Sequence, residues 1–61
     1  MKKQVMKVEI YGRTLVIRQY FGTKFEFRVF EVFPNCRNDY HLESFEAFGD
    51  AWDFVTHELW G

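Results

Sequence analysis

The stretch RTLVIRQYFGTKFEFRVFEVF, residues 13–33, decides the fold, because apolar and aromatic residues alternate there with charged and amide residues. Alternation with a period of two predicts β-strands with two different faces. Gly12 precedes the stretch and Gly22 interrupts it, and glycine marks tight turns between strands. We therefore expect an antiparallel meander with strands at about 4–11, 14–21 and 25–33.

The two expected turns set the pairing of these strands. A type II′ turn has glycine at its first central position, so Gly12-Arg13 suits the first hairpin. A three-residue GTK loop suits the second, because a slip of one residue would send every side chain to the opposite face. The expected pairs are Tyr11–Thr14, Ile10–Leu15, Val8–Ile17 and Met6–Gln19, then Phe21–Phe25, Gln19–Phe27 and Ile17–Val29.

In this register the strands present two faces of different character. The face expected to carry the core holds Met6, Val8, Ile10, Leu15, Ile17, Phe21, Phe25, Phe27 and Val29, with Gln19 and Glu31 at its margins. The second face holds Val5, Lys7, Glu9, Tyr11, Thr14, Val16, Arg18, Tyr20, Glu26, Arg28, Phe30 and Val32. Lys7, Arg18 and Arg28 form one row across this second face, and the row needs counter-charge or solvent.

The C-terminal stretch SFEAFGDAWDFVTHELW, residues 44–60, predicts an amphipathic helix over about 45–60. Its apolar stripe at helical spacing consists of Phe45, Phe48, Ala51, Trp52, Val55 and Leu59. Its acidic side consists of Glu46, Asp50 and Asp53. Ser44 is the expected N-cap. Phe54 and Trp60 fall outside the stripe, and we expect them to be exposed.

The start of the helix and the segment before it each leave two alternatives. Gly49 lowers helix propensity, so the helix begins either near 45 or at Ala47 or later. The segment PNCRND, residues 34–39, marks a loop, after which 40–43 either form a fourth strand or lead into the helix. The sequence thus predicts one α+β domain over 1–61, a three- or four-stranded antiparallel meander with a C-terminal amphipathic helix packed on one face.

Composition and charge indicate a folded protein with aromatic residues on its surface or in an interface. Thirteen of the 61 residues are aromatic, which excludes disorder and exceeds what so small a core encloses. The net charge is −1, yet residues 1–37 hold all eight Lys and Arg and three Glu, whereas 38–61 hold six acids and no base. This asymmetry indicates either an interaction surface or attraction between the two halves of the fold.

Motifs for catalysis, metals and cofactors are lacking from the sequence. HELWG, residues 57–61, begins like a zinc-protease helix, but Gly61 stands where the second His ligand is required. Cys36, His41 and His57 are too few for a structural zinc, which takes four ligands. We therefore expect no enzyme activity, no metal, no cofactor and no small-molecule substrate.

The sequence also predicts a cytoplasmic location. No apolar run approaches the roughly 18 residues that a membrane-spanning helix needs. The N-terminal segment MKKQVMKVEIYG is basic but lacks the apolar centre of a secretory leader. Cys36 stands alone, so no internal disulfide forms, as is usual in a reducing compartment.

The segment ESFEAFGDAWDFV, residues 43–55, resembles the F-x-T-x-x-E-A-x-x-F pattern of a small DNA-binding module at the N-terminus of some phage and transposon integrases. In that module a helix also follows three antiparallel strands. Ala47 stands where the pattern has Thr, and no basic residue follows it. The resemblance therefore supports the sheet-plus-helix fold and assigns no family.

Two binding functions fit these features. The first is a protein-interaction module, of the kind that phages and mobile elements use as regulators or inhibitors of a host protein. It would bind a partner protein, or a second copy of the chain as a homodimer, through the aromatic and basic sheet face or through the acidic helix. The expected anchors on the sheet are Lys7, Tyr11, Arg18, Tyr20, Arg28 and Phe30.

The alternative function is nucleic-acid binding, in which the same rings stack on bases and the same cations contact phosphates. The net charge of −1 opposes it, and so do Glu9 and Glu26 on the same face. A third interpretation needs no partner. The rings then only protect a two-sided sheet, and the long stems of Lys and Arg cover them.

Overall fold

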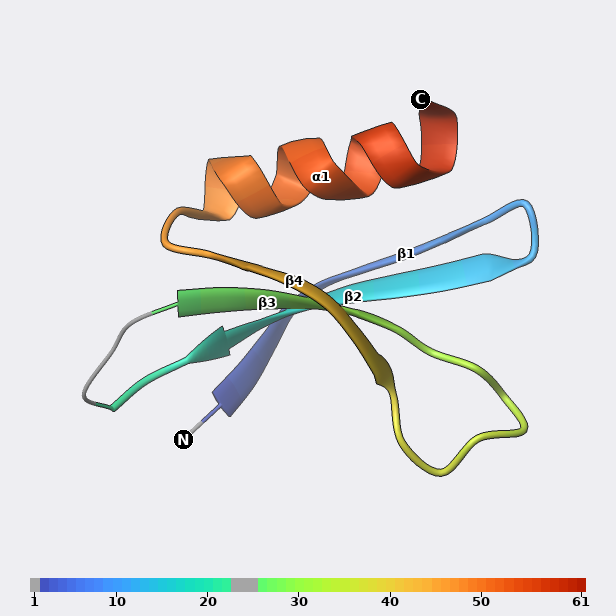
Figure 1. The fold of residues 1–61 in the computed structure, drawn as a ribbon, viewed down its shortest axis with the longest axis horizontal. Coiled ribbons are helices and arrows are strands. Elements are labelled where there is room, and N and C mark those ends of the chain that lie inside the picture. The colour runs from blue at the N-terminus through green and yellow to red at the C-terminus, as the bar shows by residue number, and fades with distance from the viewer. Residues whose placement is uncertain (1, 23–25) are drawn as a thin grey trace.

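The structure, a computed structural model, describes residues 2–22 and 26–61. Four antiparallel strands follow one another across a sheet in chain order, and one helix follows them (Figure 1). The elements are β1 (Lys2–Ile10), β2 (Arg13–Tyr20), β3 (Glu26–Glu31), β4 (Tyr40–Phe45) and α1 (Phe48–Trp60). The predicted α+β meander with a C-terminal helix is therefore confirmed in its four-stranded form.

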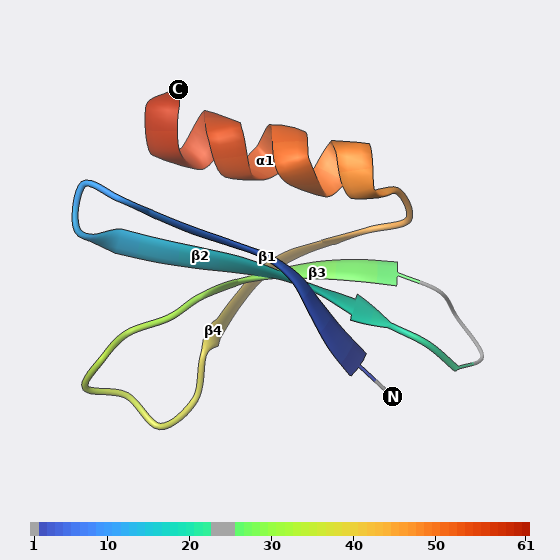
Figure 2. The same cartoon turned by 180° about the vertical axis from the view of Figure 1, so that it is seen from behind.

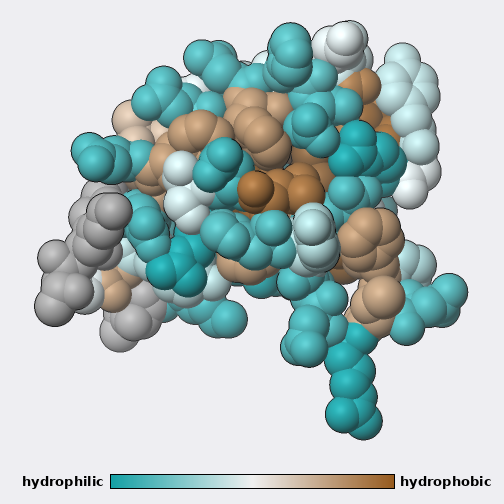
Figure 3. Space-filling view, in the orientation of Figure 1, coloured by the Kyte–Doolittle hydropathy of each residue, from teal (hydrophilic) through white to brown (hydrophobic). Residues whose placement is uncertain are grey.

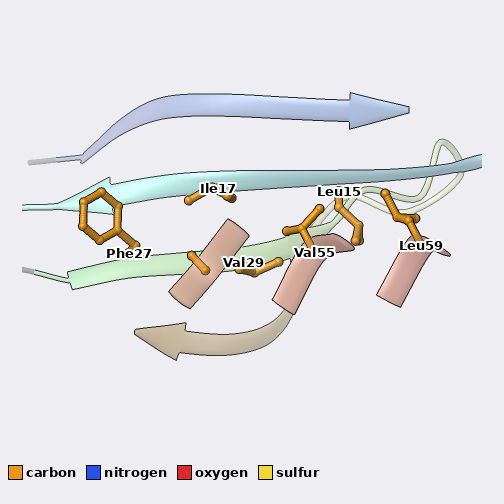
Figure 4. Close-up of a cluster of buried hydrophobic side chains, with 7 residues drawn as sticks. Leu15, Ile17, Phe27, Val29, Val55 and Leu59 are labelled. Atoms are coloured by element: carbon orange, nitrogen blue, oxygen red, sulfur yellow. The ribbon is translucent and has the colours of Figure 1, made fainter. Parts of the chain in front are cut away.

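Helix α1 lies along one face of the sheet, as both views show (Figures 1 and 2). The core between helix and sheet is apolar throughout and consists of Leu15, Ile17, Phe27, Val29, Ala51, Val55 and Leu59 (Figure 4). Its sheet residues all belong to the face predicted to carry the core. The choice of face is thus confirmed, because the apolar side of the sheet and the apolar stripe of the helix leave water only by meeting.

The first hairpin turns at Tyr11-Gly12 and not at Gly12-Arg13. Tyr11 has a φ of 53° and Gly12 a φ of 76°, and a type I′ turn requires positive φ at both central residues. The pairs are therefore Ile10–Arg13, Val8–Leu15 and Met6–Ile17. The predicted pairs were wrong by two residues. A shift of two keeps every side chain on its face, so the predicted core survived the error.

The second hairpin has the predicted register. Gln19 of β2 pairs with Phe27 of β3, and Ile17 pairs with Val29. Lys24 and Phe25, and with them the predicted Phe21–Phe25 pair, lie outside the described residues. Phe21 was expected in the core, but it follows the last residue of β2 and is 40% exposed.

A β-bulge changes the N-terminal part of β1. Gln4 pairs with Arg18 and Met6 pairs with Ile17, so the register shifts between Gln4 and Met6. Val5, which was predicted on the second face, packs at the edge of the core instead. A bulge twists an edge strand and hinders its pairing with another chain.

Helix α1 begins at Phe48, which agrees with the later of the two predicted starts. Its N-cap is Ala47, which has an extended backbone and forms no side-chain capping hydrogen bond. Ser44 was wrongly predicted as the N-cap, since it lies in β4. Glu46 is likewise not on the helix but in the connection before it. Residues 40–45 pair with β3, and the ladder of a fourth strand outweighs the helix propensity of this segment.

Phe54 was expected to be exposed, but it is half-buried. Its ring centroid lies 5.6 Å from that of Phe45 in β4, because α1 packs against β4 as well as β2 and β3. The buried side of the helix is therefore wider than its predicted stripe. Figure 3 shows hydrophobic surface gathered where the helix meets the sheet, with hydrophilic side chains around it. Trp60, in contrast, is 51% exposed.

Arg13 ties the C-terminal end of α1 to the sheet. Its Nε and Nη2 donate hydrogen bonds to the Glu31 carboxylate at 3.0 and 2.8 Å, and its Nη1 donates to the Glu58 carbonyl oxygen at 3.2 Å. The hydrogen bonds and the positive charge of Arg13 lower the pKa of Glu31. The hydrogen bond to Glu31 also raises the pKa of Arg13. Bidentate, charge-assisted pairs of this kind are among the stronger hydrogen-bonded contacts in proteins.

Candidate functional site

The sheet face opposite α1, which we call the helix-free face, is only partly solvated. Val16 at its centre is 2% exposed, and Tyr20 and Phe30 are half-buried. The β3–β4 loop, residues 32–39, extends on this side of the sheet (Figures 1 and 2). The prediction of a second face open to water was therefore wrong for Val16, because the loop and neighbouring side chains enclose it.

Two arginines lie over two aromatic rings on the helix-free face. Cζ of Arg28 lies 4.1 Å from the centroid of the Tyr20 ring, and Cζ of Arg18 lies 4.8 Å from that of Phe30. The two rings are 6.4 Å apart, and His41 packs on Phe30 at 5.3 Å. Cation–π contacts contribute about 0.5–1 kcal/mol each at exposed sites. Four predicted anchors thus come together, but they contact one another.

Carboxylates balance the charge of the same two arginines. Nη2 of Arg18 donates a hydrogen bond to Asp39 in the β3–β4 loop. Nε of Arg28 donates one to Glu26 at 2.7 Å. Sequence reasoning missed the role of Asp39, since no local pattern links a loop acid to a strand cation 21 residues away. The two ion pairs leave less positive charge here than the sequence suggested.

The predicted row of Lys7, Arg18 and Arg28 does not form. Lys7 pairs with Val16 in the observed register, and Gln4 takes the predicted place beside Arg18. Nζ of Lys7 lies 3.9 Å from the Glu9 carboxylate, and the Lys7 side chain is 54% exposed. An exposed pair at this distance contributes little. Lys7 therefore presents most of its charge to solvent.

A groove of about 730 Å³ opens on the helix-free face beside the tip of the first hairpin. Its sides are the β1–β2 hairpin and the β3–β4 loop. Its lining includes Lys7, Tyr11, Val16, Arg18, Val32 and Pro34. The twist of the sheet and the β3–β4 loop together make this part of the small domain concave.

Tyr11 lies at this groove in an unfavourable backbone conformation. Residues other than glycine rarely adopt positive φ, and Asn or Gly suits the first central position of a type I′ turn better. The Tyr11 side chain is 80% exposed, and no hydrogen bond, ion pair or ring contact with the described residues holds it. A strained residue whose side chain does nothing for the fold is a candidate for function.

The acidic side of α1 is a separate surface. Asp50 and Asp53 are exposed on the helix, and Asp50 lies in the first turn, where the helix dipole favours a negative charge. The helix and the helix-free face lie on opposite sides of the sheet (Figure 1). The two predicted sets of partner-binding residues therefore belong to different surfaces, and one short segment cannot contact both.

Cys36, His41 and His57 do not line the groove. The described part of the chain contains no group of three or more His, Cys, Asp and Glu side chains arranged to hold a metal ion. Nε2 of His41 lies 2.9 Å from Oγ of Ser44, and Cys36 is exposed in the β3–β4 loop. No helix in residues 2–22 or 26–61 is long and apolar enough to cross a membrane.

Comparisons with protein-family models, with curated proteins and with solved structures found no match to this chain. A function therefore has to be argued from the site itself. The groove supplies an apolar floor, an exposed aromatic ring and an exposed amine. These groups make the groove a candidate binding site.

Proposed function

We propose that this protein is a small, non-enzymatic interaction module that binds a segment of a partner protein in the groove of the helix-free face. A concave site with an apolar floor and a few polar groups is the usual form of a binding site. Tyr and Arg are enriched among the anchors of protein interfaces. A module of this kind acts by occupying a surface, which is how a small regulator or inhibitor of a larger protein works.

Tyr11 is the observation that carries the proposal. A left-handed backbone costs a residue such as Tyr about 1 kcal/mol or more. A domain of this size has roughly 3–9 kcal/mol of total stability, so the cost is a sizeable fraction. The Tyr11 ring recovers none of it within the described structure, since it is 80% exposed. Burial of the ring against a partner would recover it.

The other predicted anchors on the sheet take a supporting role in this proposal. Arg18 bonds to Asp39 and so holds the β3–β4 loop beside the groove. Arg28 covers Tyr20, and neither residue lines the groove. Of the six expected anchors, Lys7 and Tyr11 therefore remain as groups that contact the partner, with Arg18 as the residue that shapes the site.

Nucleic-acid binding is the weaker alternative. A base could stack on Tyr20 or Phe30 only by displacing the guanidinium group that lies over the ring. Those guanidinium groups are already paired with Glu26 and Asp39. Phosphate binding depends on a strong positive field, and the chain as a whole carries −1.

We also place the protein in the cytoplasm, where the exposed, free Cys36 would stay reduced. A partner encountered there is another cytoplasmic protein. Small regulators and inhibitors encoded by phages and mobile elements are the closest functional analogy, and the analogy concerns the mode of action only.

The substitution Tyr11→Asn tests the proposal, because it separates binding from stability. Asn fits the turn better, so the variant should unfold at a higher urea concentration than the wild type. The immobilised variant should nevertheless capture less of the bound partner from a lysate of the source cells. Tyr40→Asn is the matched control, since Tyr40 is also exposed but lies on β4, away from the groove.

The outcomes of this experiment are separable. Loss of one captured protein with Tyr11→Asn but not with Tyr40→Asn supports the groove as the binding site. Equal capture by both variants and the wild type overturns the proposal. So does a loss with Tyr40→Asn alone, because the partner would then sit on the β4 side of the molecule.

A further inference from the structure

We propose that the segment bound in the groove is acidic and carries an apolar or aromatic anchor residue. This inference rests on the proposed function and adds the chemistry of the partner. Three observations support it: the distribution of charge between the two sides of the sheet, the state of the charged groups at the groove, and the apolar floor.

The charges of the described residues divide between the two sides of the sheet. On the helix-free side, with the β3–β4 loop that extends there included, five cations oppose three carboxylates and leave a balance of +2: Lys2, Lys7, Arg18, Arg28 and Arg37 against Glu9, Glu26 and Asp39. On the side of α1, two cations oppose six carboxylates and leave −4: Lys3 and Arg13 against Glu31, Glu43, Glu46, Asp50, Asp53 and Glu58. Most acids of residues 38–61 thus lie on the side of α1, and the two sides of the sheet carry opposite net charge.

The charged groups at the groove leave positive charge for a ligand. Arg18 is already paired with Asp39. Glu9 accepts a hydrogen bond from Thr14 Oγ1 at 3.5 Å and lies 3.9 Å from Lys7. In the described part of the chain, Lys2 and Arg37 form no ion pair with a carboxylate, and both are exposed. A carboxylate of the ligand would meet Lys7 at the groove, and Lys2 and Arg37 add to the positive charge of the molecule outside it.

The floor of the groove calls for an apolar anchor. Val32 and Pro34 supply its accessible apolar surface, since Val16 also lines it but is only 2% exposed, and none of the three offers a side-chain hydrogen bond. The ring of Tyr11 stands at the side. A ligand side chain that buried itself here would release water from apolar surface on both molecules, which favours Leu, Phe or Trp over a polar residue.

A second copy of the chain does not fit this description. A closed dimer through the helix-free face would bring two positive sides together. Two copies cannot each place the acidic helix in the groove of the other at the same time, since the helix and the groove lie on opposite sides of the sheet (Figures 1 and 2). Head-to-tail contacts of that kind close into rings or continue into open chains, and they do not form a two-fold dimer. The charge distribution therefore favours a different protein and weighs against the homodimer expected from the sequence.

Selection from a random peptide library displayed on phage tests this inference with the full chain as bait. Peptides that bind should be net acidic and contain an aromatic or large aliphatic residue. They should perturb the amide NMR signals of Lys7, Tyr11 and Val16. Lys7→Glu should weaken binding of a selected peptide roughly tenfold, because it replaces attraction by repulsion. Lys3→Glu, the same charge change on the side of α1, should weaken it much less.

The results distinguish this inference from the proposed function. Neutral or basic peptides that perturb the groove overturn the inference and leave the proposed function standing. Equal effects of Lys7→Glu and Lys3→Glu on peptide binding also overturn the inference, because the effect of the charge would then not depend on its distance from the groove. A library that yields no groove-binding peptide overturns both. So does a fluorescent single-stranded oligonucleotide that binds the groove more tightly than every selected peptide.

Discussion

Removal of the charge of Glu31 should loosen the C-terminal end of α1 from the sheet. Glu31 accepts two hydrogen bonds from Arg13, at 2.8 and 3.0 Å, and its side chain is 12% exposed. Glu31→Gln keeps the size of the side chain and one acceptor oxygen but removes the charge. Hydrogen bonds to charged groups contribute about 1.5–3 kcal/mol each. The Arg13 side chain is 36% exposed, so water and Glu58 would satisfy much of the released guanidinium.

Glu31→Gln should therefore lower the free energy of unfolding by about 1–2 kcal/mol at neutral pH, which is below the cost of breaking a fully buried ion pair. In a domain of this size, 1 kcal/mol corresponds to a shift in Tm of about 4–8 °C. Arg13 lowers the pKa of Glu31 in the folded state. A carboxyl group with a lowered folded pKa stabilises the fold above its unfolded pKa of about 4.3, and this contribution is lost as the pH falls through the folded pKa.

Urea denaturation followed by the fluorescence of Trp52 and Trp60 measures both effects. The difference in unfolding free energy between the wild type and Glu31→Gln should be largest at neutral pH and should shrink as the pH falls through the lowered pKa of Glu31. Glu9→Gln is the control, because the Glu9 side chain is 68% exposed and lies 3.9 Å from Lys7; its effect should stay below about 0.5 kcal/mol. A difference independent of pH, or equal losses for both variants, would refute the role given to Arg13 and Glu31.

Four further changes test the helix cap, the core, the turn and the interior of α1. Ala47→Ser should raise the free energy of unfolding by about 1 kcal/mol, because its hydroxyl can accept a hydrogen bond from the first turn of α1 that Ala47 leaves unmade. Val55→Ala should lower it by about 2 kcal/mol, since Val55 is 1% exposed and the change removes two methyl groups and leaves a cavity. Gly12→Ala should lower it by about 1 kcal/mol, because φ is 76° there. Gly49→Ala should raise it by up to about 1 kcal/mol, since nothing lies within 4 Å of the added Cβ in α1.

The same urea titrations and thermal melts by circular dichroism check these values. Val32→Ala is the control for the core. Because Val32 is half-buried, this variant should lose less unfolding free energy than Val55→Ala. Glu46→Ser is the control for the cap, since Glu46 is adjacent to Ala47 but outside the N-cap position. Equal gains from the two serines would contradict the cap assignment. Equal signs for the two glycine replacements would contradict the turn assignment.

Local patterns in the sequence predicted the architecture. Alternation with a period of two in β2 and β3 placed Ile17 and Val29 on the core face, because a residue's face in a strand depends only on its parity. The same rule selected the register of the second hairpin. The spacing of Ala51, Val55 and Leu59 identified the buried stripe of α1, because apolar residues recur about every 3.6 residues along an amphipathic helix.

Tertiary structure decided the rest. Two registers of the first hairpin, two residues apart, bury the same side chains, so hydrophobicity could not choose between them, and the turn at Tyr11-Gly12 did. The contact of Arg18 with Asp39 spans 21 residues, and no pattern within a strand or helix encodes such a pair. The groove exists only because the β3–β4 loop returns beside the twisted sheet. Secondary structure and sidedness are local properties of the chain, whereas concavity and charge pairing belong to segments that meet only in the folded molecule.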